Sequence, residues 1–63
     1  MKSEWRVTSN SINGKTVFAA FRLIDKAAVD HSGNREYNGG YHENKDYVEK
    51  IVEALNTFQL DNN

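Results

Sequence analysis

Residues 5–24 read WRVTSNSINGKTVFAAFRLI, and most of the architecture of the 63-residue chain follows from this stretch. Polar and apolar residues alternate before the Asn13-Gly14 pair, and the most apolar part of the chain follows it. Asparagine-glycine between two such runs is a strong short-range signal for a β-hairpin. We therefore predict two antiparallel strands, over residues 4–10 and 16–24, joined by a tight turn.

The length of this turn determines which side chains share a face of the hairpin, because a one-residue shift moves a whole strand to the other face. A two-residue turn at Asn13-Gly14 would pair Trp5 with Arg22. A three-residue loop, Ile12-Asn13-Gly14 with the glycine left-handed at a bulge, would pair Trp5 with Phe21 and give one continuous apolar face. We predict the three-residue loop, with Trp5 buried between the sheet and a helix, against Phe21.

Two further elements complete the predicted fold. Ser32-Gly33-Asn34 signals a turn, and residues 35–41 follow as a third strand. Beyond Asn44, a suitable N-cap, apolar residues recur at intervals of three and four, which predicts an amphipathic helix over residues 45–58 with Asn56 on its solvated face. The chain is thus predicted to be one small α+β domain over residues 1–63, a three-stranded antiparallel sheet with one C-terminal helix packed on one face (β-β-β-α). Its predicted core is Trp5, Val7, Val17, Ala19, Phe21, Leu23, Ile51, Val52 and Leu55.

Composition narrows the class of protein. The chain is 38% hydrophobic and 27% charged, has no cysteine, and carries a net charge of −1, with six basic and four acidic residues in 1–41 against two and five in 42–63. No apolar run approaches the ~18 residues of a membrane-spanning helix. Met1-Lys2-Ser3-Glu4-Trp5 lacks the apolar core of a secretion signal, so we expect a cytoplasmic protein with no membrane partner.

No group of residues predicts catalysis. Asp30-His31-Ser32 contains the residue types of a hydrolytic triad, but adjacent residues cannot align as one, and the segment is typical of a polar turn. His31, His42, Asp30 and Glu43 lack the spacing of a metal motif. We therefore expect no enzymatic activity, no metal and no cofactor.

The face of the predicted sheet turned away from the helix is the candidate binding surface. Exposed apolar residues beside arginines suit a protein interface, and they also suit a nucleic-acid strand. The connection over residues 26–34 folding back, or a second copy, could instead cover the face. Tyr37 and Tyr41 either rest on the core beside Trp5 or join this face. The predicted binding residues are Arg6, Thr8, Phe18, Arg22, Ile24 and Arg35, with Ala20 between them.

The segment AVDHSGNREY, residues 28–37, resembles a group of short uncharacterised proteins from Gram-positive bacteria and their mobile elements. The resemblance extends over roughly Trp5 to Asn56. It brings no established activity and therefore implies no catalytic or binding residues.

The β-β-β-α order, with Gly40-Tyr41 ending the third strand before an acidic helix, is similar to the arm-binding domain of phage integrases. That resemblance implies a sheet face lying in a DNA groove, with Arg6, Arg22 and Arg35 as the contacts. Those domains are rich in lysine and arginine, whereas this chain is net negative, and phosphate contacts supply most of nonspecific affinity. We therefore predict a small interaction module that binds a protein partner or itself, with DNA or RNA binding as the alternative.

Overall fold

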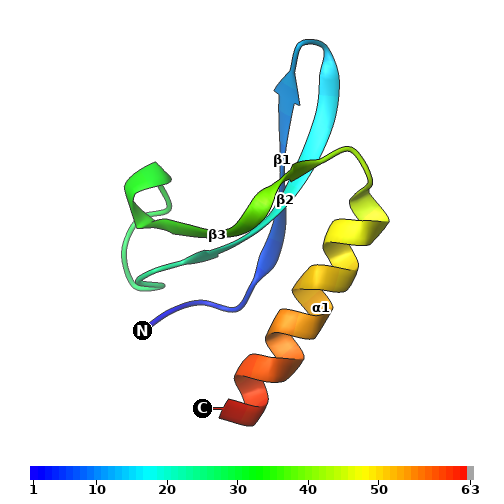
Figure 1. Ribbon diagram of the computed structural model, residues 1–63. Helices are drawn as coiled ribbons and strands as arrows, with labels where there is room; N and C mark the ends of the chain where they lie inside the picture. The colour runs from blue at the N-terminus through cyan, green and yellow to red at the C-terminus, as the bar shows by residue number, and fades with distance from the viewer. Residues whose placement is uncertain (63) are drawn as a thin grey trace.

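The computed structural model describes residues 1–62, with side chains as far as Phe58. The elements are β1 (Arg6–Ile12), β2 (Lys15–Leu23), the short 3-10 helix η1 (Ser32–Asn34), β3 (Arg35–His42) and α1 (Lys45–Asn62) (Figure 1). The strands form one antiparallel sheet in the order β1-β2-β3, and α1 packs against it. The predicted α+β class and β-β-β-α order are confirmed. Asn63 lies outside the described residues.

The turn between β1 and β2 has two residues, so the predicted three-residue loop is wrong. Asn13 and Gly14 have φ angles of 52° and 79°, both positive, as a type I′ turn requires. Arg6 consequently pairs with Phe21, which places Trp5 on the face opposite to Phe21. The prediction failed because β2 is apolar on both faces, so the apolar pattern could not select the register. The preference of asparagine-glycine for a type I′ turn selects it.

The core between the sheet and the helix is built on Trp5, Ala20 and Val48, which are 5%, 1% and 0% exposed. Trp5 is buried as predicted, but its sheet neighbour is Ala20 and not Phe21. The predicted core residues Val17, Ala19, Phe21 and Leu23 alternate with Ala20 along β2 and therefore point away from α1. Ala19, Phe21 and Leu23 are nevertheless buried, as predicted, on the opposite side of the sheet. Around the three central residues pack Val7, Phe18, Ile51, Val52 and Leu55.

Asn56 anchors α1 to the first strand. The backbone N–H of Trp5 donates to Asn56 Oδ1 at 2.7 Å, and Asn56 Nδ2 donates to the Trp5 carbonyl oxygen at 3.0 Å. The amide thus takes the position of a neighbouring strand at this edge of the sheet. The predicted solvated position of Asn56 is wrong. The helix also continues to Asn62 instead of ending near residue 58.

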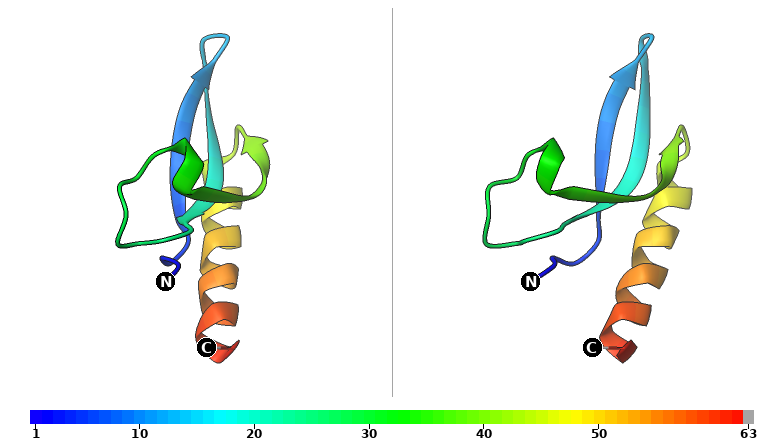
Figure 2. Two further views of the ribbon diagram at one scale, coloured as in Figure 1. Left: turned by 90° about the vertical axis from the view of Figure 1, so that its left-hand side faces the viewer. Right: turned by 60° about the vertical axis from the view of Figure 1, so that its left-hand side comes forward.

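Two parts of the molecule project from the packed region. Pairing between β2 and β3 runs from Leu23–Arg35 to Phe18–His42, so the hairpin beyond Phe18 has no third strand beside it. Figures 1 and 2 show this tip extending past both β3 and α1, and the connection over residues 25–34 swinging out at the opposite end. Within the described residues, no helix is both long enough and apolar enough to cross a membrane.

Candidate interaction surface

The face of the sheet opposite to α1, here called the outer face, carries arginine and aromatic side chains from all three strands. The register places Phe21 of the central strand between Arg6 on β1 and Tyr37 on β3. The side chains of the outer face are Arg6, Thr8, Asn10, Val17, Ala19, Phe21, Leu23, Arg35, Tyr37 and Tyr41.

Phe21 lies at the centre of the outer face and is only 5% exposed, although no helix covers it. The guanidinium carbon of Arg35 lies 4.1 Å from the centre of the Phe21 ring, and that of Arg6 lies 5.7 Å from it. The ring of Tyr37 approaches from the third strand at 6.4 Å between centroids. These contacts are within the range of cation–π and tilted aromatic interactions, so the two arginines cover the phenylalanine.

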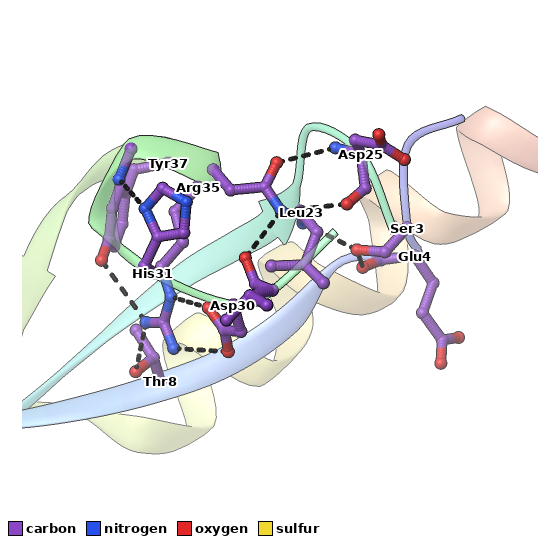
Figure 3. A network of polar contacts seen from close by, with 12 residues as sticks. Ser3, Glu4, Thr8, Leu23, Asp25, Asp30, His31, Arg35 and Tyr37 are labelled. Carbon is purple, nitrogen blue, oxygen red and sulfur yellow. Dashed lines mark hydrogen bonds and ion pairs between the residues drawn. The ribbon is translucent and has the colours of Figure 1, made fainter. Parts of the chain in front are cut away.

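Arg35 is held in place by a network of polar contacts (Figure 3). Its Nε and Nη2 donate to the two carboxylate oxygens of Asp30 at 2.7 and 3.0 Å, and its Nη1 donates to Thr8 Oγ1 at 3.3 Å. The hydrogen bonds from Arg35 lower the pKa of Asp30, and Asp30 in turn raises the pKa of Arg35. This fork fixes the plane of the guanidinium over Phe21 and compensates its charge.

Two tyrosines form the open part of the outer face. Tyr37 and Tyr41 are 41% and 39% exposed, and their ring centres lie 6.2 Å apart. The neighbouring Arg35 lowers the pKa of Tyr37, and the neighbouring Tyr37 hydroxyl raises the pKa of Tyr41. The sequence left open whether Tyr37 and Tyr41 rest on the core beside Trp5 or lie on the outer face. Tyr37 contacts Phe21 and Tyr41 contacts Tyr37, so both tyrosines lie on the outer face. Tyr37 and Tyr41 are four residues apart on β3, and side chains of a strand alternate between its faces, so the two share one face. The register shift between Asn38 and His42, where Gly39 has a φ of 77°, adds two residues to β3 and leaves this alternation unchanged.

The structure brings together three of the six predicted binding residues. Arg6, Thr8 and Arg35 share the outer face. Phe18 and Arg22 are on the helix side instead, because the register differs from the predicted one by one residue.

The misplaced residues have structural contacts of their own. The Arg22 guanidinium lies 4.5 Å from the ring centre of Trp5, and its Nη2 donates to Glu36 at 3.1 Å. Ile24 lies beyond the end of β2 and is 45% exposed. Sequence reasoning missed Phe21 as the centre of the outer face, and the type I′ preference of Asn13-Gly14 was the signal that could have found it.

The connection over residues 25–34 reaches the outer face through Asp30, and it is organised by Asn34. The Asn34 side chain is 7% exposed; it accepts from the Asp25 N–H at 2.9 Å and donates to the carbonyl oxygens of Asp25 and Val29 at 2.9 and 3.1 Å. His31 Nδ1 accepts from the Gly33 N–H at 3.1 Å. Asp30 and His31 therefore make turn and arginine contacts, and the arrangement contains no hydrogen-bonded triad.

Among the described residues, no group of three or more histidine, cysteine, aspartate or glutamate side chains is placed to hold a metal ion. Comparisons with protein-family models, with curated protein sequences and with solved structures gave no match.

Proposed function

We propose that this chain is a small interaction module that binds a protein partner through the outer face. The observation that carries the proposal is the cluster of Arg6, Arg35, Tyr37 and Tyr41 around Phe21, on a sheet face that no helix covers. Tyrosine and arginine are enriched among the residues that dominate the binding energy of protein interfaces. The Asp30 fork holds Arg35 in one geometry, so little side-chain entropy remains to be lost on binding.

The charges on this surface favour a protein over a nucleic acid. Of the arginines assigned to DNA by the integrase resemblance, Arg22 is bound to Glu36 and Arg35 to Asp30. Arg6 makes no ion pair among the described residues, although Asp30 lies near enough for the charge of Arg6 to contribute to the lowered pKa of that carboxyl group. Nucleic-acid affinity depends on neutralising many phosphates, and this face offers few free cations for that purpose.

The experiment compares capture of proteins by the wild type and by the double variant Tyr37→Ser/Tyr41→Ser. Tyr47→Ser is the matched control, because Tyr47 is a tyrosine with 51% exposure that lies on α1 and not on the outer face. We expect a partner that the wild type and the control retain and the double variant loses, followed by the same order of affinities in titrations with the purified partner. Capture that is equal for all three proteins would overturn the assignment to this face.

A gel-shift experiment distinguishes the proposed binding of a protein from the alternative, binding of DNA or RNA. Binding through phosphates must weaken steeply between ~50 and ~200 mM salt. Under the proposal, neither DNA nor RNA is shifted at the lower salt concentration. A salt-sensitive shift that Arg6→Gln abolishes would favour the alternative.

A further inference from the structure

The free edge of β1 is open to another strand over a short, defined segment. In a hairpin with a two-residue turn, Ile12 and Lys15 form a hydrogen-bonded pair, so Arg6, Thr8 and Asn10 direct their backbone groups toward β2. Val7, Ser9 and Ser11 direct theirs outward. Within the described part of the chain, nothing accepts from or donates to the backbone of Val7 or Ser9 on this side.

Asn56 closes this open segment at one end. It occupies the outward N–H and C=O of Trp5, so an added strand cannot continue past that residue. At the other end the Ser11 N–H is held by the side chain of its own neighbour, Asn10, at 2.9 Å, a local contact that a stronger backbone partner can replace. The available donors and acceptors are therefore those of Val7, Ser9 and Ser11, with Ser9 in the middle.

The two edges of the sheet differ in how they are protected. β3 has an irregular pairing with β2 at the bulge around Gly39, and charged Arg35 and Glu36 at its start. β1 has no proline, no bulge and no charged residue after Arg6. Proteins usually protect an edge strand with such devices because unpaired backbone groups attract other strands. Their absence from β1 is expected of an edge that has a partner.

We infer that β1 pairs with β1 of a second copy of this chain, antiparallel and with a two-fold axis at Ser9. In this register Val7 faces Ser11 of the second copy, so all three outward residues find partners. The strand of the second copy ends at Ile12, opposite Arg6, and its turn comes level with Trp5, where Asn56 closes the edge.

The side chains across the proposed interface are compatible. Arg6 is the only charged residue of β1 and would lie opposite Ile12 of the second copy, while Thr8 would lie opposite Asn10. Like charges opposite one another destabilise a strand pair, and this register contains no such pair. An extended peptide of another protein could use the same backbone groups, but an edge whose open groups and side chains match their own copy favours self-pairing.

The inference goes beyond the proposed function. Pairing of this kind would join two sheets into one of six strands and place two outer faces side by side in a continuous surface. It leaves Tyr37 and Tyr41 exposed, because both are on the strand farthest from the paired edge. Failure of partner capture and failure of self-pairing can therefore be observed separately.

Ser9→Pro tests the pairing, with Ser9→Ala as its control. Proline removes an N–H that no other described residue uses, and it is tolerated on edge strands when the N–H faces outward. Sedimentation equilibrium should show a concentration-dependent dimer for the wild type and for Ser9→Ala. For Ser9→Pro the dissociation constant should rise by about 30-fold or more, because two hydrogen bonds are lost per dimer.

A cysteine variant gives a second readout that does not depend on the folding of Ser9→Pro. The chain has no cysteine, so Ser9→Cys introduces a single thiol, and paired residues at the axis lie about 5.5 Å apart between Cα atoms, within reach of a disulfide. Oxidation should convert this variant to a covalent dimer, whereas Thr16→Cys, on β2 opposite Ser11, should stay largely monomeric. A wild type that remains monomeric at every concentration overturns the inference. So does a dimer that Tyr37→Ser/Tyr41→Ser dissociates and Ser9→Pro leaves intact.

Discussion

The Glu36 carboxylate contacts both Lys2, near the start of the chain, and Arg22, whose guanidinium covers the ring of the buried Trp5. Its carboxylate accepts from Arg22 Nη2 at 3.1 Å and from Lys2 Nζ at 3.1 Å, and the Arg22 guanidinium lies over the ring of Trp5. Arg22 is the more important partner, since its side chain is 11% exposed and binds through both Nε and Nη2. The hydrogen bond from Arg22 lowers the pKa of Glu36, with a smaller effect from Lys2.

The contact between Glu36 and Arg22 predicts that acid lowers the stability of the fold. A carboxyl group whose pKa is lower in the folded protein than in the unfolded chain stabilises the fold above its unfolded pKa, and that contribution is lost as the pH falls through the folded value. We expect the free energy of unfolding to decrease below about pH 4.5, the ordinary pKa of a glutamate. Urea denaturation at several pH values should show the loss. In Glu36→Gln, which is destabilised at pH 7, the remaining acid dependence should be smaller than in the wild type.

Asn56 makes the other single-residue contact on which the packing of the helix depends. Replacing it by alanine leaves the N–H and C=O of Trp5 without partners in a partly buried position, which costs about 1–3 kcal/mol. Glu53→Ala, one turn earlier on the exposed side of α1, should change stability by less than about 0.5 kcal/mol. Denaturation curves of the two variants compare them directly. Equal stabilities would mean that the Asn56 amide does not hold the helix to the strand.

At the scale of the elements, the β1–β2 turn determines both faces of the sheet. Gly14 and Gly40 both have open space around the position of an added Cβ, but only Gly14 has a positive φ, at +79°. We therefore expect Gly14→Ala to cost about 1 kcal/mol and Gly40→Ala to be nearly neutral, because the difference reports backbone strain and not steric contact. Thermal denaturation of the pair measures it, and equal melting temperatures would contradict a type I′ turn. A β-branched residue, as in Gly14→Val, should cost more.

The β1–β2 hairpin also shows which features of the fold could be predicted from the sequence and which could not. The order of the strands and the helix, and the burial of Trp5, follow from apolar periodicity and turn residues, and both were predictable. The placement of Phe18, Phe21 and Arg22 was not, because a central strand that is apolar on both faces gives no alternation from which to choose a register. The contribution of Asn56 could not be read from the sequence either, since the amide acts on a strand 51 residues away. Half of the predicted binding residues therefore lie together on the outer face, whereas the aromatic centre of that face was not predicted.

The whole molecule is thin, with principal extents of 38 × 25 × 12 Å. Its accessible surface of 4516 Å² exceeds the roughly 4,100 Å² expected for a monomer of its mass. The hairpin tip, the connection over residues 25–34 and the outer face of the sheet all add exposed surface. Folding therefore depends on one small helix-side core and on the arginine cover of Phe21, and the proposed pairing and partner binding would both bury surface that the monomer leaves open.

This small core makes Trp5 the most sensitive position in the molecule. Truncating a buried tryptophan to alanine costs about 3–5 kcal/mol, which is comparable to the whole stability expected of a 63-residue domain, so Trp5→Ala should be largely unfolded. Trp5→Phe should stay folded, because the buried indole N–H finds no acceptor among the described residues and its removal leaves no group unpaired. Circular dichroism distinguishes the two variants, with Glu49→Ala on the exposed side of α1 as the control. The emission of the single tryptophan should shift to longer wavelength on unfolding of the wild type, and emission already at the solvent-exposed wavelength in the native protein would contradict this core.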